Sequence, residues 1–184
     1  LLALAIASYL FISLISYHPN DPSWSYTGEA IEAIQNWGGK IGAIGADILL
    51  YSFGIVSYSF PLIILYLGWF VNHPQTALQD WQHLIPKWIG FCLLIGAGCG
   101  LVSLHASTPF VLPSNAGGIV GDFISESLVN WFNIIGATLF LIAFFMLAIS
   151  LSTRISWLKL CEKIGHYLLF GLNHFTQNKN TSDN

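Results

Sequence analysis

Residues 131–152 read WFNIIGATLFLIAFFMLAISLS, and this stretch decides the class of fold. It is long enough to cross the hydrocarbon core of a bilayer, which takes about 20 predominantly apolar residues in an α-helix. It holds no Asp, Glu, Lys or Arg. Its apolar side chains also occupy every face of the helix, whereas a helix on the surface of a soluble protein is apolar on one face only. The stretch therefore predicts a transmembrane helix.

Three further stretches have the same character, and we expect spans at about 1–17, 46–71 and 88–106. Asp47 lies at the very start of the second span, where a carboxylate favours a helix N-terminus. The chain opens inside the first span without a Met, so we expect a fragment of a longer protein. The predicted fold class is an all-α membrane protein, a four-transmembrane-helix bundle over residues 1–176, with a linker starting at 177–184.

The composition also indicates a membrane protein. The chain has 184 residues, 54% of them apolar and 8% charged, whereas soluble domains carry about 25% charged residues. A small membrane transporter or channel subunit is the alternative, and it would need a polar pathway through the bundle. The side chains in or near the spans that could line such a pathway are hydroxyls: Ser13, Ser52, Ser57, Ser59, Ser103 and Thr138.

The positions of the charges predict the topology. Cytoplasmic segments collect Lys and Arg, and the tail after residue 152 holds Arg154, Lys159, Lys163 and Lys179. The loops 18–45 and 107–130 hold five acidic side chains against one Lys. We therefore expect both termini in the cytoplasm and these two loops in the periplasm, with the chain in a bacterial inner membrane.

Trp side chains gather near the predicted membrane borders, as in the aromatic belts of membrane proteins. The predicted interface anchors are Trp69, Trp88 and Trp157 on the inner side and Trp131 on the outer side, where Trp24 and Trp37 also lie.

Two segments outside the spans are predicted to be interfacial helices. From Thr27 to Trp37, apolar side chains recur on one helical face, so this helix lies either on the outer surface of the membrane or against the bundle. Residues 156–175 place two Lys one turn apart, as expected for a helix on the inner leaflet. Pro61, in the middle of the second span, is expected to kink that span.

Small residues recur at the spacing that lets membrane helices approach closely. Gly38 and Gly42 form one pair, followed by Gly45, while Gly96 and Gly100 form another within the third span. These glycines are the predicted positions of helix packing and oligomerisation. The spacing leaves open whether the contacts lie within one bundle or between protomers.

Sequence motifs for catalysis and cofactor binding are missing. The chain has no HExxH and no GxSxG, and residues 38–41 lack the flanking residues of a phosphate loop. Its three Cys and six His are scattered, which argues against a disulfide framework or a metal site. We therefore expect no enzyme activity, cofactor or metal in this segment.

Several motifs together resemble one family. They are the turn Ser16-Tyr17-His18-Pro19-Asn20-Asp21-Pro22-Ser23-Trp24-Ser25, the runs Asn36-Trp37-Gly38-Gly39 and Gly45-Ala46-Asp47, and the later runs Asn115-Ala116-Gly117-Gly118-Ile119-Val120-Gly121, Ser156-Trp157 and Glu162-Lys163-Ile164-Gly165. With four spans and both ends inside, the chain resembles the N-terminal membrane domain of FtsK/SpoIIIE-type DNA translocases, most closely the FtsK of Gram-negative bacteria.

This resemblance implies a membrane anchor and scaffold at the division septum, active in cell division and chromosome segregation. The implied partners are membrane lipids, further copies of the chain (a hexamer in the full-length family) and other division proteins. Contact with those proteins is expected through the outer turn, at Asp21, Pro22, Ser23 and Trp24. ATP, Mg²⁺ and DNA are implied only for a motor domain that these residues do not include.

Overall fold

The computed structural model describes residues 1–26, 34–71, 81–107 and 112–153. Its elements are α1 (Leu2–Ile15), α2 (Gly39–Phe53), the 3₁₀-helix η1 (Gly54–Ser59), α3 (Phe60–Val71), α5 (Trp81–His105) and α6 (Gly118–Thr153). The described ranges contain helices and no strand, which confirms the all-α fold class.

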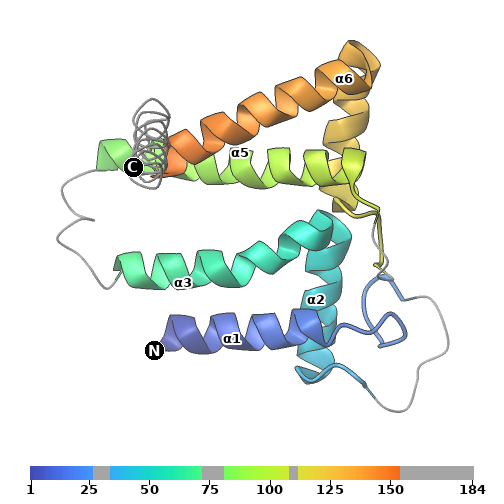
Figure 1. Ribbon diagram of the computed structural model, residues 1–184. Coiled ribbons are helices and arrows are strands. Elements are labelled where there is room, and N and C mark those ends of the chain that lie inside the picture. Colours follow the sequence, from blue (N-terminus) through green and yellow to red (C-terminus); the bar gives the residue numbers. More distant parts are fainter. Residues whose placement is uncertain (27–33, 72–80, 108–111, 154–184) are drawn as a thin grey trace, which may run out of the picture.

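Four helical segments lie side by side, and two others run across one end of them (Figure 1). The side-by-side segments are α1, α3, α5 and the second part of α6, whereas α2 and the first part of α6 are transverse. The described parts of the connections after α1 and after α5 lie beside the transverse helices (Figure 1). We call this end of the bundle the loop end. The start of α1 and the end of α6 lie at the opposite end, the terminus end (Figure 1). The first and the last described helices thus begin and end, respectively, on the same side of the bundle.

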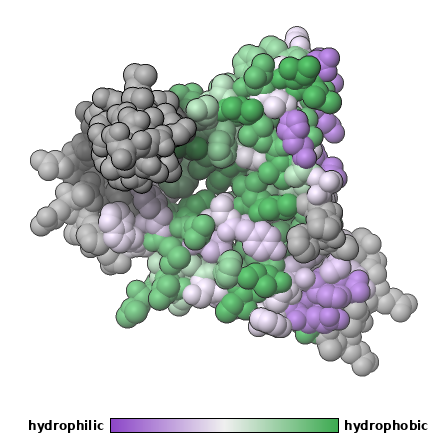
Figure 2. Space-filling view, viewed as in Figure 1, coloured by the Kyte–Doolittle hydropathy of each residue, from purple (hydrophilic) through white to green (hydrophobic). Residues whose placement is uncertain are grey.

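The helices present an apolar surface that requires lipid. In the described residues, three helical stretches are long and apolar enough to cross a membrane, Gly39–Trp69, Ile85–His105 and Gly118–Ser152, and α1 is a shorter apolar helix. Only 22%, 22% and 17% of their most apolar windows are buried inside the protein. Figure 2 shows hydrophobic side chains over the bundle and hydrophilic ones gathered toward the loop end. Because water cannot cover so much apolar surface, the chain is a membrane protein.

A turn divides the second predicted span. One helix over 46–71 with a kink at Pro61 was expected, but α2 begins at Gly39 and the chain turns at Gly54, where φ is 56° and ψ is −138°. Only glycine adopts this backbone conformation at low cost. Pro61 lies in the first turn of α3, where its missing N–H leaves no hydrogen bond unmade. The change of direction therefore belongs to Gly54, and Asp47 lies within the transverse α2 rather than at the start of a span.

The helix that contains the fourth predicted span is longer than expected and bent, and only its part after the bend runs with the side-by-side helices. α6 begins at Gly118 instead of residue 131, so much of the predicted loop 107–130 is helical. The bend lies at Asn133, where φ is 59° and ψ is 170°. This combination of angles lies outside the left-handed helical region that Asn tolerates and is normally restricted to Gly, so the backbone of Asn133 is strained. Asn133 Oδ1 accepts the N–H of Ile134 at 2.6 Å.

The other predicted boundaries differ less. α1 ends at Ile15 instead of residue 17, and α5 begins at Trp81, seven residues before the predicted start. The predicted helix at 27–37 is wrong at its end, because residues 34–36 are not helical. Three parts of these predictions lie outside the described residues: positions 27–33 of this helix, the predicted helix 156–175, and Trp157.

The two halves of the chain repeat one arrangement. Each half contains the pattern Asn-x-Gly-Gly-x-x-Gly, at 36–42 and at 115–121. The second Gly of the pair has a positive φ in both halves, 65° at Gly39 and 67° at Gly118, and it begins the transverse helix. Fifteen residues later the chain again adopts a positive φ, at Gly54 and at Asn133, and turns into a side-by-side helix. Each half therefore consists of three segments in order: a helix that runs to the loop end, a transverse helix, and a helix that runs back to the terminus end.

Candidate functional site

A buried polar network closes the loop end of the first half. Asp21 is 2% exposed, and its carboxylate accepts the backbone N–H groups of Gln35 and Asn36, both at 2.8 Å. The Asn36 side chain donates to the carbonyl oxygen of Ser13 and accepts the N–H of Gly38, again at 2.8 Å. Because these buried groups have partners, their hydrogen bonds offset the cost of removing them from water. It ties the loop after α1 to the end of that helix.

Asp47, in the middle of α2, forms a second buried network. Its side chain is 0% exposed. Oδ2 accepts the N–H of Ser25 at 2.8 Å, and Oδ1 accepts the hydroxyls of Ser25 at 2.6 Å and Tyr17 at 3.2 Å. Burial raises the pKa of Tyr17, and the nearby charge of Asp47 raises it further. Asp47 therefore fastens the first loop to the transverse helix.

The second half has a comparable network at the same end. Ser103 Oγ donates to Asp122 Oδ1 at 2.6 Å, and Asn115 Nδ2 donates to Asp122 Oδ2 at 2.8 Å. A Cβ placed on Gly121 would lie 3.2 Å from Ser103 Cβ, just as one on Gly42 would lie 3.2 Å from Ser13 Cβ. In both halves a Ser of the preceding helix thus packs on a Gly of the transverse helix.

The two halves are joined at the turn after α2. The N–H of Ile55 donates to the carbonyl oxygen of Ala116 at 2.9 Å. A Cβ on Gly54 would overlap that same carbonyl, and a Cβ on Gly118 would overlap the carbonyl of Ser52. The backbones meet so closely that only glycine fits at either position. Neither residue was among the predicted sites; the signal that could have pointed to Gly118 is the repeated Asn-x-Gly-Gly pattern.

The predicted packing glycines have different surroundings. A Cβ on Gly38 or Gly42 would meet Ser13, and one on Gly100 would lie 3.0 Å from Leu141. One on Gly96 would lie at an ordinary 3.4 Å from Ile124, while one on Gly45 would have nothing within 4 Å. Contacts within one bundle therefore account for most of these positions. Of the five, Gly45 alone has open space beside it, and an oligomerisation role stays a prediction.

The predicted partner contacts in the outer turn also differ from one another. Asp21 is buried and supports the turn from within, and Ser23 Oγ is buried without a hydrogen-bond partner among the described residues. Trp24 is 68% exposed and lies edge-on to Tyr51 with 5.5 Å between ring centroids. Pro22 is part of the same turn. Contact with another protein stays a prediction for this turn, with Trp24 as the side chain best placed for it.

The predicted Trp anchors lie on the surface. Trp69, Trp88 and Trp131 are all exposed, as a side chain must be to contact lipid headgroups. Trp69 is close to the end of α3, and Trp131 is two residues before the bend in α6. Anchoring by these side chains stays a prediction.

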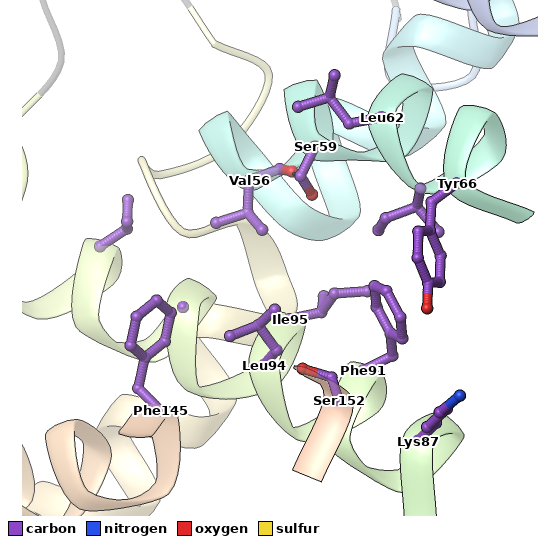
Figure 3. Close-up of a pocket in the computed structure, with 13 residues that line it drawn as sticks. Val56, Ser59, Leu62, Tyr66, Lys87, Phe91, Leu94, Ile95, Phe145 and Ser152 are labelled. Carbon is purple, nitrogen blue, oxygen red and sulfur yellow. The ribbon is translucent and has the colours of Figure 1, made fainter. Parts of the chain in front are cut away.

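An apolar cavity of about 800 Å³ separates α3 and η1 from α5 and α6. Figure 3 shows Val56, Ile95, Leu94 and Phe145 along it, with Lys87 at one end. The cavity lies between the two halves, which meet through the packing of α2 on α6, through η1 and through the second loop.

Several of the hydroxyl groups that could line a polar pathway have partners among the described residues. Ser13, Ser57 and Ser59 each donate to a backbone carbonyl three to eight residues earlier, at 2.6 to 2.9 Å. Thr138 donates to the carbonyl of Ile134 and contacts His105. Across the described part of the chain, no three His, Cys, Asp or Glu side chains are grouped so that they could hold a metal ion.

We predict that Gly42→Ala weakens the packing of α2 on α1. The new Cβ would lie 2.6 Å from Ser13 Oγ and 2.8 Å from Asn36 Oδ1, and both side chains are held by hydrogen bonds. The expected loss in the free energy of unfolding is about 1–3 kcal/mol, measured in detergent micelles. Gly96→Ala is the matched control and should change it by less than about 1 kcal/mol, because Ile124 can adjust. Equal effects would contradict the packing argument.

Comparison with known proteins supplies the family. Residues 1–165 match the family described as the 4TM region of DNA translocase FtsK/SpoIIIE. The DNA translocase FtsK of Shewanella oneidensis is 38% identical over 165 residues, which cover 87% of this chain and 18% of that protein. Those of Pseudomonas syringae pv. syringae and Pseudomonas aeruginosa are 33% and 32% identical over 167 and 169 residues, covering 90% of this chain and 21% of each protein.

No solved structure matches the chain. The chain spans about one fifth of the length of the curated relatives it matches, so it corresponds to their membrane segment and not to the whole translocase. The family match extends over nearly the whole chain, and the resemblance seen in the outer turn and the glycine runs is confirmed. The chain therefore belongs to the family of the 4TM region of DNA translocase FtsK/SpoIIIE.

Proposed function

We propose that this domain anchors a DNA translocase in the bacterial inner membrane at the division septum and brings its motor subunits together there. It thereby contributes to cell division and chromosome segregation without hydrolysing ATP or binding DNA itself. The observation that carries the proposal is the architecture: apolar helices lie side by side, and the described chain starts and finishes at the terminus end. A domain of this kind holds whatever follows it on one face of a membrane.

The charge pattern supports an orientation with the terminus end in the cytoplasm. Lys and Arg follow α6 in the sequence, while acidic side chains predominate in the segments at the loop end. Cytoplasmic segments of membrane proteins carry this excess of Lys and Arg. The loop end, with its exposed Trp24, then faces the periplasm, where it is available to other division proteins.

Self-association is proposed through the outward face of α2. Ile41, Gly45 and Ile48 recur at helical spacing, both Ile side chains are exposed, and Gly45 has open space beside it. A small residue flanked by exposed apolar ones permits close approach of a second helix. Copies held side by side raise the effective concentration of the tethered motors and so favour a ring without any new contact between motors.

The proposal is tested by imaging. The 184 residues, with a C-terminal fluorescent protein, are expressed in a host depleted of its own translocase membrane domain. We expect a midcell band and restored division. Gly45→Leu should weaken the band while the protein stays in the membrane, since α2 keeps its contacts within the bundle. An even membrane distribution with continued filamentation would contradict the scaffold role and leave only the anchor.

A further inference from the structure

The cavity between the two halves is long, and the described residues that line it are almost all apolar. Along α5 its lining runs from Lys87 to Val102, which is about 22 Å at 1.5 Å per residue. The opposite wall is formed by Val56 and Leu62 in η1 and α3, and Phe145 of α6 closes one side. Such a lining excludes water, so the occupant inside a membrane must itself be apolar.

The length of the cavity suits a hydrocarbon chain. The roughly 22 Å of its lining along α5 exceeds the roughly 15 Å of one leaflet of the bilayer, so one acyl chain can lie along it. The groups at the end of the cavity distinguish a lipid from an apolar helix as the occupant, because a phospholipid carries a charged headgroup at the end of its acyl chains.

Polar groups are concentrated at one end of the cavity. Figure 3 shows the Lys87 ammonium and the Tyr66 hydroxyl at this end, with Ser152 on the facing helix. Lys87 lies in the first third of α5, Tyr66 in the second half of α3, and Ser152 next to the end of α6, so these groups lie toward the terminus end. An ammonium has three donors and can bind a phosphate oxygen beside another acceptor. Basic pockets between transmembrane helices bind anionic headgroups in this way.

We infer that the cavity is a binding site for an anionic phospholipid, with one acyl chain between the two halves and the phosphate at Lys87. The lipid fills the space between two helix pairs that otherwise touch mainly near the loop end. This site rests on the cavity and the surrounding membrane alone, and it stands independently of any role in cell division.

The inference is tested by native mass spectrometry of the delipidated chain in mild detergent. The chain is titrated with phosphatidylglycerol or with phosphatidylcholine carrying the same acyl chains. We expect a single tightly bound phosphatidylglycerol, held about fivefold more tightly than phosphatidylcholine, since one Lys at a lipid surface contributes about 1 kcal/mol. Lys87→Gln should remove this preference. Lys40→Gln, an exposed Lys on α2 at the loop end, is the matched control and should retain it.

A second variant tests the acyl chain independently of charge. A Cβ on Gly98 would lie 3.8 Å from Phe145 and 3.9 Å from Val56, so Gly98→Leu can enter the cavity without disturbing the backbone. It should lower the binding of both lipids at least about fivefold while the unfolding temperature without lipid is unchanged. Equal binding of the two lipids by the wild-type chain, unchanged binding in Gly98→Leu, or a dimer in place of a lipid adduct would each overturn the assignment.

Discussion

Gly54→Ala is expected to lower the free energy of unfolding by about 3 kcal/mol or more, the largest effect expected from so small a change. Gly54 has φ 56° and ψ −138°, a conformation that costs other residues about 1–3 kcal/mol. The added methyl would also overlap the Ala116 carbonyl oxygen. Since that carbonyl accepts the N–H of Ile55, moving it away breaks the hydrogen bond between the two halves, at a further cost of about 1–3 kcal/mol.

The measurement is unfolding in detergent micelles, with Gly45→Ala as the matched control. Gly45 is also in α2, but it has ordinary helical backbone and nothing within 4 Å of a Cβ. Replacing a helical glycine by alanine stabilises a helix by up to about 1 kcal/mol. The two substitutions should therefore change stability in opposite directions. If the two substitutions changed the free energy of unfolding by the same amount in the same direction, the turn at Gly54 would not be the close contact between the two halves that we describe.

Asp47→Ala is expected to have the next largest effect, a loss of about 3 kcal/mol. The carboxylate is fully buried and accepts three hydrogen bonds from Ser25 and Tyr17. Removing it leaves these donors without a partner, and each buried unsatisfied group costs about 1–3 kcal/mol unless water reaches it. The released loop should also become sensitive to limited proteolysis, because Ser25 no longer holds it to α2.

Glu126→Ala is the control for this prediction. Glu126 lies as many residues after Gly121 as Asp47 lies after Gly42, but its side chain is exposed. Its replacement should change stability by no more than about 0.5 kcal/mol and leave the proteolysis pattern unaltered. A similar response from the two variants would mean that Asp47 does not fasten the loop.

Hydropathy was sufficient to find the apolar helices but not to place their turns. The residues from Gly39 to Val71 are almost continuously apolar, so the pattern cannot distinguish a transverse helix followed by a span from one longer span. The turn depends on the backbone of Gly54, and its neighbours Ser52, Phe53 and Ile55 resemble those of any membrane helix. Pro61 is the more conspicuous helix breaker in the sequence, yet it lies where a helix begins and disrupts nothing.

The polar residues of the loop end show a similar limit. Asp21, in a turn of prolines and polar residues, has the sequence context of an exposed contact, but its carboxylate is buried by backbone from residues 35 and 36. Nothing local in the sequence pairs Asp47 with Ser25 or Asn36 with Ser13, since such contacts depend on the tertiary path of the loop. The two Asn-x-Gly-Gly-x-x-Gly patterns were visible, and aligning them indicates equivalent turns at Gly54 and Asn133.

The repeated arrangement has a consequence for how such a chain can grow. Each unit leaves the terminus end with one helix and comes back to it with another. With any whole number of units in tandem, the segment that follows therefore lies in the same compartment as the segment that precedes them. Gaining or losing a complete unit would change the width of the anchor and leave the following domain on the same side of the bilayer. Gaining or losing a single helix would place that domain on the opposite side.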